Sequence, residues 1–191
     1  MNVKSTFQTR IGGRNENQDY YKFSETNKGK LFVLCDGLGG HLGGRHAAEL
    51  ATETIFKHFK KRQDENVARI LENAIEKANM KIWKEGINDE RYNSMGTTVV
   101  ALLITPDSAI SCHAGDSRIY QIRNKEIIFR TADESYVFEL VKQGKMTEEE
   151  ARISEMANLI VNFICFDSEA NMNLNFLNYE QGDRFLLCSD G

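Results

Sequence analysis

Three aspartates stand at the ends of apolar runs, each beside a glycine. One run ends at Asp36–Gly37, a second at Gly115–Asp116 and a third at Asp190–Gly191. A carboxylate is costly to remove from water unless a cation or a hydrogen-bond donor meets it. Carboxylates in a chain without a Cys-x-x-Cys pair suit hard divalent cations such as Mg²⁺ or Mn²⁺. One Asp-Gly after a strand is usually a turn, but three together predict a metal site.

Strands and two consecutive helices must position these aspartates. Apolar residues recur at helical spacing over Ala47–Phe59 and over Val67–Ile82, and we expect the helices to begin after Gly44 and to end at Gly86. Strands are predicted over residues 3–11, 31–35, 97–104, 109–113, 118–123, 126–130 and 184–188. Strands on both sides of a helix pair favour antiparallel sheets with helices outside them. The predicted fold class is α+β.

Composition indicates one intracellular domain over residues 1–191. With 41% hydrophobic and 27% charged residues the chain can bury a full core, and its net charge of −4 offers no basic field for nucleic acid. No apolar stretch reaches the roughly 18 residues of a membrane span, and the N-terminus lacks a secretory signal. The four cysteines suit core packing better than disulfides. We therefore expect a cytoplasmic protein that binds neither nucleic acid nor membrane.

Six motifs follow one another along almost the whole chain. They are Arg14–Asp19, Asp36–Gly44, Gly96–Thr98, Gly115–Arg118, Thr131–Ala151 and Leu187–Gly191. In content and order they resemble the metal-dependent serine/threonine protein phosphatases of the PPM (type 2C) family, bacterial type. The resemblance implies a sandwich of two antiparallel sheets flanked by helix pairs (αββα). It also implies a hydrolase acting on phosphoserine and phosphothreonine in proteins, with water activated between two Mn²⁺ or Mg²⁺ ions and room for a third.

The resemblance also implies which residues bind the cations. The expected metal residues are Asp36, Gly37, Asp190, Asp116, Asp19 and Gln18. Asp36 would bridge both ions, the Gly37 carbonyl would bind one of them, and Asp190 would hold the other. Asp19 would support this inner shell through water or hydrogen bonds. Asp116 would either bind a weaker third cation or cap the turn before Ser117.

Two residues are expected to act on the phosphate group. Arg14 offers a planar fork for two phosphate oxygens, which lysine lacks, and the resemblance favours this role over that of a solvated surface arginine. His41 follows closely behind Asp36 and could protonate the leaving seryl or threonyl oxygen as a general acid. A loop histidine is more often simply solvated. The implied partners are phosphoproteins and the serine/threonine kinase that supplies them.

The chain departs from the family pattern at several places. Gln18 stands where many members have glutamate, which removes one negative charge although an amide oxygen still accepts hydrogen bonds. Glu134 replaces the usual histidine of an Asp-His-Ser element. The sequence stops at Gly191, before the family's terminal Asp-Asn motif. We therefore expect a C-terminally incomplete chain with weaker metal binding, feeble activity and self-association through an uncovered edge.

Other functions have weaker support in the sequence. A nucleotide-binding loop fails because Leu42 occupies the third glycine position of Gly-x-Gly-x-x-Gly and no Gly-Lys-(Ser/Thr) exists. A zinc site fails because no histidine or cysteine pair has ligand spacing. The alternative that stays open is a catalytically impaired phosphatase-like module that binds phosphoproteins or a regulatory partner.

Overall fold

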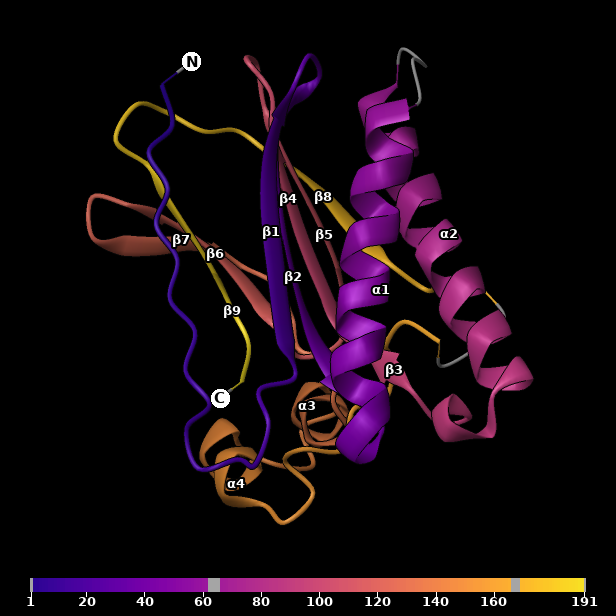
Figure 1. Cartoon of the computed structure of the whole chain (residues 1–191). Coiled ribbons are helices and arrows are strands. Elements are labelled where there is room, and N and C mark those ends of the chain that lie inside the picture. Colours follow the sequence, from indigo (N-terminus) through magenta and orange to yellow (C-terminus); the bar gives the residue numbers. More distant parts are fainter. Residues whose placement is uncertain (1, 62–65, 166–168, 191) are drawn as a thin grey trace.

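Two antiparallel β-sheets lie face to face, and a pair of long helices covers the outer side of the larger sheet (Figure 1). The computed structural model describes residues 2–61, 66–165 and 169–190. The layers follow one another as small sheet, large sheet and helices, which confirms the α+β class with two antiparallel sheets predicted from the sequence.

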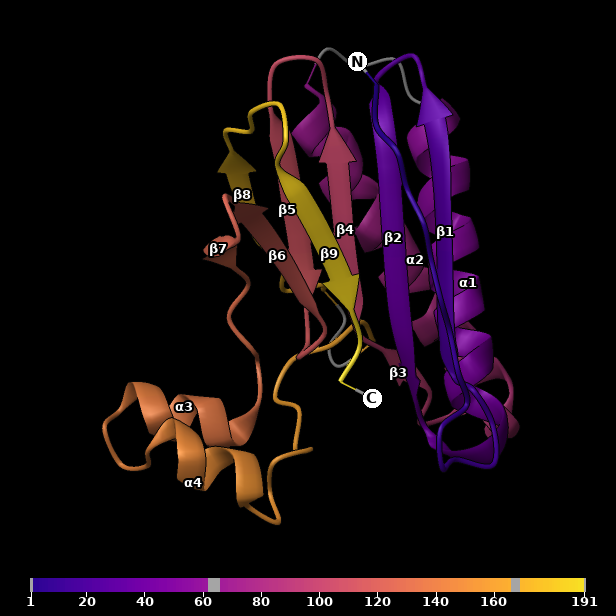
Figure 2. The same cartoon turned by 90° about the vertical axis from the view of Figure 1, so that its left-hand side faces the viewer.

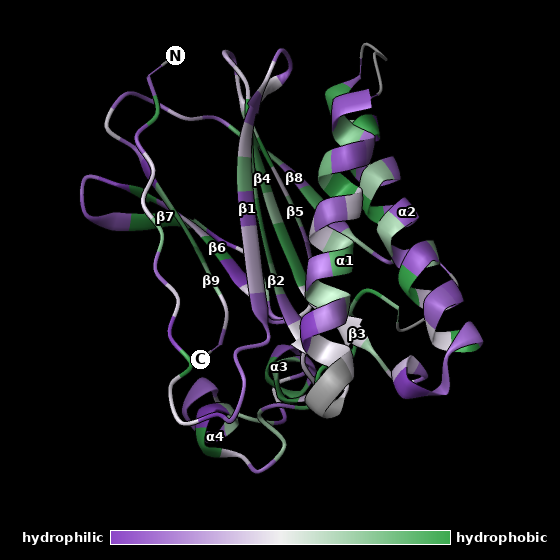
Figure 3. Cartoon of the chain, in the orientation of Figure 1, coloured by the Kyte–Doolittle hydropathy of each residue, from purple (hydrophilic) through white to green (hydrophobic). Residues whose placement is uncertain are grey.

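The large sheet carries most of the core. Its strands are, in spatial order, β1 (Asp19–Thr26), β2 (Gly29–Leu38), β4 (Val99–Ile104), β5 (Ala109–Ala114) and β8 (Asn173–Leu177), and β3 (Gly96–Thr97) pairs with the end of β2. Every residue of β4 and β5 is buried, because these central strands are covered on both faces. Their apolar residues stand out in Figure 3.

The small sheet has the strand order β7 (Glu126–Arg130), β6 (Arg118–Arg123) and β9 (Arg184–Cys188). The hairpin between β6 and β7 turns at Asn124 and Lys125, whose φ angles are 51° and 70°. Two consecutive residues with positive φ match the right-handed twist of the flanking strands. The tight turn predicted at these residues is therefore confirmed.

Helices α1 (Gly40–Lys61) and α2 (Val67–Asn88) pack on each other and on the large sheet. Asn66 caps α2, since its side chain accepts hydrogen bonds from the first backbone N–H groups of the helix. A short 3₁₀ helix, η1 (Glu90–Tyr92), follows. Helices α3 (Tyr136–Lys142) and α4 (Glu148–Ile153) lie together at one end of the sandwich (Figure 2). Thr147 and Glu150 form the predicted capping box of α4.

Alternation along β2 divides its side chains between two cores. Leu31, Val33 and Cys35 join the core beneath the helices, whereas Phe32 and Leu34 pack toward the small sheet. Because successive side chains of a strand point to opposite faces, the side chain of Asp36, the next residue of the second series, lies on the face of β2 toward the small sheet. The alternation therefore directs this carboxylate into the space between the sheets.

The expected strand over residues 3–11 is wrong. The segment is extended but carries no strand hydrogen bonds, because no neighbouring strand pairs with it among the described residues. It instead lies along β1, where the ring of Phe7 packs on that of Tyr21 with centroids 4.7 Å apart. This ring contact and a hydrogen bond from Nδ2 of Asn17 to Oγ1 of Thr9 at 2.6 Å hold the segment without strand pairing.

Two helix boundaries also differ from expectation. The helix α1 includes Gly43 and Gly44 within its first turns, and α2 continues through Gly86 to Asn88. A Cβ on Gly86 would lie 2.9 Å from the carbonyl oxygen of Tyr92. This glycine therefore allows a close approach of η1 to the helix and does not end it.

All four cysteines are free thiols. Cys35 and Cys112 are buried, while Cys165 and Cys188 are half-buried. Burial raises the pKa of Cys35 and of Cys112 to about 12. Within the described ranges, no helix combines the length and the apolar character that crossing a membrane requires.

Candidate metal centre

Three aspartates from three strand ends meet between the sheets. The antiparallel register of β1 and β2 places Asp19 directly opposite Asp36. Asp190 follows β9 and lies close enough to Asp36 for its charge to raise the pKa of the Asp36 carboxyl group. The neighbouring Ser189 donates from Oγ to Oδ2 of Asp19 at 3.0 Å. The segment that follows β9 is thus joined to the start of β1 at this group of carboxylates.

The carboxylates raise one another's pKa. Burial, together with the charges of Asp19, Asp190 and Asp116, raises the pKa of Asp36 to about 8. Burial and the charge of Asp190 raise the pKa of Asp116 to about 6. Burial also raises the pKa of Asp19. Negative charges held together out of water favour a bound cation, so these residues fit a divalent metal ion.

The arrangement does not form a closed cage. Across 2–61, 66–165 and 169–190, no three His, Cys, Asp or Glu side chains are grouped closely enough to hold a metal ion. The fit to a cation therefore rests on the shared electrostatic field and on the oxygen-only chemistry of the donors.

The Gly96–Thr98 motif fixes the backbone of Asp36. The carbonyl oxygen of Asp36 accepts from the N–H of Thr98 and from Oγ1 of Thr97, both at 2.9 Å. The N–H of Asp36 donates to Oγ1 of Thr98 at 3.1 Å. These bonds hold Asp36 near the C-terminal end of β2, which explains why two threonines follow Gly96.

Glycines bring the start of α1 into backbone contact with the end of β2. A Cβ on Gly37 would lie 2.0 Å from the carbonyl oxygen of Gly44, a distance that no side chain tolerates. The N–H of Gly37 donates to the carbonyl of Gln18 at 3.3 Å. A Cβ on Gly44 would in turn meet Oε1 of Gln18 at 2.6 Å. Gln18 therefore contacts Gly37 and Gly44, the glycines that follow Asp36 in the sequence.

Arg45 belongs to this region, although sequence reasoning missed it. Its Nη1 donates to the carbonyl of Asp19 at 2.5 Å and to that of Asn17 at 3.3 Å, and its guanidinium lies 5.0 Å from the ring centroid of Tyr20. Arg45 therefore ties α1 to the segment that carries Asp19. The only signal in the sequence was its place one helical turn after His41.

Arg14 lies on the segment that precedes β1. Arg14 is exposed in a turn before β1, where its N–H donates to the carbonyl of Ile11 at 3.2 Å. No hydrogen bond or ion pair between described residues joins its guanidinium to Asp19 or Asp36. His41 is the second residue of α1, but its side chain lies outside the described part of the structure.

The fold and the group of aspartates belong to a known class of enzyme. A sequence profile of the family described as protein phosphatase 2C matches residues 9–191. The chain therefore belongs to the protein phosphatase 2C family and is a serine/threonine phosphatase that hydrolyses phosphoserine and phosphothreonine in proteins.

Similar proteins come from several bacteria. Protein phosphatase PhpP of Streptococcus pneumoniae is 37% identical over 93% of this chain and 74% of its own length. The structure of the serine/threonine phosphatase of S. agalactiae matches with a TM-score of 0.86 and 34% identity, covering 93% of this chain and 74% of that one. The catalytic domain of the phosphatase PstP, solved in complex with two manganese ions, matches with a TM-score of 0.75 and 30% identity over 93% and 72% of the two chains.

Proposed function

We propose that Asp36 and Asp190, supported by Asp19, hold two Mn²⁺ or Mg²⁺ ions with which this chain removes phosphate from phosphoserine and phosphothreonine. The observation that supports the assignment is the convergence of strand ends: the register of β1 and β2 places Asp19 opposite Asp36, and Ser189, the neighbour of Asp190, is hydrogen-bonded to Asp19. PstP, which is 30% identical, was solved with two manganese ions. The Gly37 carbonyl and Asp116 complete the oxygen donors in this proposal.

The residues of the chain divide the work of hydrolysis. Bound divalent cations make water nucleophilic near neutral pH and neutralise phosphoryl oxygens. Asp36 can hold the cations in a fixed position because Thr97 and Thr98 are hydrogen-bonded to its backbone. Arg45 and Ser189 hold Asp19 in place from the helix side and from β9. Hydrolysis therefore depends on donors that three separate strands deliver.

A direct assay tests this proposal. Purified protein, treated with a chelator and then supplied with Mn²⁺, should release phosphate from a phosphoserine peptide and from a nitrophenyl phosphate. The chelated sample without added metal should release none. Equal release with and without Mn²⁺ would contradict a role for divalent cations.

We further propose that Arg14 binds the phosphate group of the substrate. The turn that carries Arg14 leads directly into β1, which begins at Asp19. Arg14→Ala should weaken binding of the phosphopeptide and of inorganic phosphate together, by about tenfold, because both lose a charge-assisted pair. KM and the inhibition constant of phosphate measure this. Arg69→Ala, an exposed change on α2, is the matched control, and unchanged phosphate inhibition in Arg14→Ala would remove the role.

We also propose that His41 is the general acid. It stands in the first turn of α1, immediately beyond the end of β2. Because a general acid matters most for a poor leaving group, His41→Ala should slow hydrolysis of the phosphoserine peptide by about a hundredfold. The nitrophenyl ester should be slowed far less. Similar losses on both substrates would exclude the role.

Partners follow from the chemistry of the substrate. A serine/threonine kinase must supply the phosphoproteins, and a cytoplasmic location suits a chain whose four cysteines are free thiols.

Self-association would use the edge of β9, which pairs with β6 alone in the described sheet and leaves Leu186 49% exposed. Light scattering over a range of concentrations tests this, and a constant monomer mass would contradict it.

A further inference from the structure

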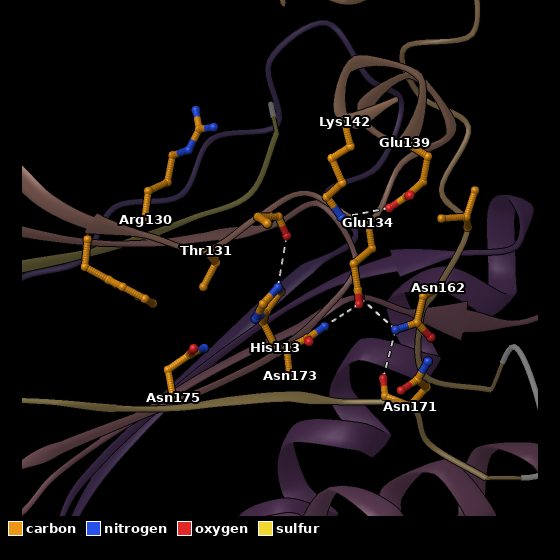
Figure 4. A pocket seen from close by; sticks show the side chains of 13 residues that line it. His113, Arg130, Thr131, Glu134, Glu139, Lys142, Asn162, Asn171, Asn173 and Asn175 are labelled. Carbon is orange, nitrogen blue, oxygen red and sulfur yellow. Dashed lines mark hydrogen bonds and ion pairs between the residues drawn. The ribbon is translucent and has the colours of Figure 1, made fainter. Parts of the chain in front are cut away.

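Glu134 accepts hydrogen bonds from three separate parts of the chain. Its Oε2 accepts from the backbone N–H of Gly115 at 2.8 Å and from Nδ2 of Asn162 at 2.7 Å, and its Oε1 accepts from Nδ2 of Asn173 at 2.5 Å. Figure 4 shows the two asparagines reaching this carboxylate in a pocket of about 520 Å³. Asn162 is itself held, because its amide also donates to the carbonyl of Asn171 at 2.8 Å.

The backbone of Glu134 strengthens its hold on Gly115. The N–H of Glu134 donates to the carbonyl of Gly115 at 3.1 Å, so Gly115 is bound through both its N–H and its C=O. Gly115 has a φ of +109°, and a Cβ there would lie 2.7 Å from Cγ2 of Thr98. The turn between β5 and β6 thus adopts a backbone conformation that favours glycine, and Glu134 holds it from one side.

The preceding residue holds the same turn from its other end. The carboxylate of Asp133 accepts two hydrogen bonds from Arg118, one of them from Nε to Oδ1 at 2.7 Å. Such a bidentate pair fixes geometry as well as adding energy. Asp133 and Glu134 therefore fasten residues 115 and 118, and Asp116 lies between the two fastened points.

We propose that Glu134 is a positioning residue that holds Asp116 in its place at the metal centre. The proposal rests on the proposed function in one respect, namely that Asp116 binds a cation. An ionised carboxylate has about four acceptor sites and can take all three bonds, whereas a histidine ring has at most one acceptor nitrogen. The carboxylate of Glu134 thus matches the donors that Gly115, Asn162 and Asn173 supply in this chain.

The first test follows the amide of Gly115 by hydrogen exchange in the metal-free protein. Glu134→Ala should speed exchange of this amide by about tenfold or more, because its acceptor is lost. Glu134→Gln keeps one amide oxygen and should have a smaller effect; it also serves if the alanine variant folds poorly. Glu139→Gln is the control, since Glu139 lines the same pocket but pairs only with Lys142 in the described structure. Unchanged exchange in both Glu134 variants would overturn the proposal.

The second test asks whether the effect passes through Asp116. Calorimetric titration with Mn²⁺ should show the weakest-bound ion losing about fivefold or more in affinity in Glu134→Ala. In an Asp116→Asn background the same change should cost nothing further, because residues acting through one another are not additive. An equal loss in both backgrounds would overturn the link between the two residues.

The two tests separate this proposal from the function on which it rests. If Asp116→Asn alone leaves Mn²⁺ binding unchanged, the metal role of Asp116 fails. The exchange rate of Gly115 then decides by itself whether Glu134 holds the turn, since that measurement needs neither metal nor activity.

Discussion

Asp36→Asn is expected to lower Mn²⁺-dependent phosphate release by about a thousandfold or more while the protein stays folded. The carboxylate of Asp36 lies among those of Asp19, Asp190 and Asp116, and a neutral amide in its place cannot attract two cations. The change keeps the shape of the side chain and the backbone bonds to Thr97 and Thr98. Phosphate release and circular dichroism of the same sample measure the two parts of the expectation.

Asp107→Asn is the matched control for this substitution. Asp107 is exposed in the turn between β4 and β5, so the change removes one negative charge away from the carboxylates. Its activity should equal that of the parent. If Asp36→Asn retained activity within a few-fold of the parent at saturating Mn²⁺, Asp36 would not be the central metal ligand.

Without metal, the protein should become less stable as the pH rises from about 4 to about 8. The pKa of Asp36 is about 8 in the folded chain against an ordinary value of 3.8, and that of Asp116 is about 6. In this window the folded state keeps protons that the unfolded state releases, so the free energy of unfolding falls with rising pH. The fall should be on the order of a few kcal/mol. Thermal or urea unfolding in chelator at several pH values measures it.

Two comparisons make this expectation specific. Asp36→Asn should flatten much of the decline, since an amide does not titrate, and should make the metal-free protein more stable than the parent at pH 8. Excess Mn²⁺ should reverse the trend in the parent, because a ligand that binds the folded state stabilises it. A metal-free stability that rose steadily from pH 5 to pH 8 would show that Asp36 is ionised without a cation.

Most of the fold could be predicted because local patterns and tertiary contacts agree in its centre. The apolar run of β2 and the all-apolar β4 are strands of the core, and Asn124–Lys125 is a tight turn that Asn124 favours. The prediction of a strand over residues 3–11 was wrong because alternating apolar residues form a half-exposed strand only where a partner strand exists. The predicted helix end at Gly86 was wrong because a glycine can allow close packing inside a helix as well as end one.

The candidate site was predictable only where it is local in sequence. Asp36 and Asp190 could be predicted as site residues because each comes at the end of an apolar run. Arg45 donates to backbone carbonyls 26 and 28 residues away, and a backbone partner leaves no trace in residue types. The same holds for Glu134, whose partners Asn162 and Asn173 are polar residues in irregular or exposed positions. Motif comparison could mark Glu134 as unusual but could not show what it binds.

The burial of the thiols has a consequence for oxidative stress. Burial raises the pKa of all four cysteines above the ordinary thiol value, and that of Cys35, the neighbour of Asp36, reaches about 12. Peroxide attacks the thiolate, so protonated thiols react slowly. Phosphatases that use a cysteine nucleophile are silenced when that sulfur is oxidised. None of the residues proposed for the chemistry of this chain is a cysteine, so we expect its phosphate release to withstand peroxide concentrations that inactivate an enzyme with a cysteine nucleophile.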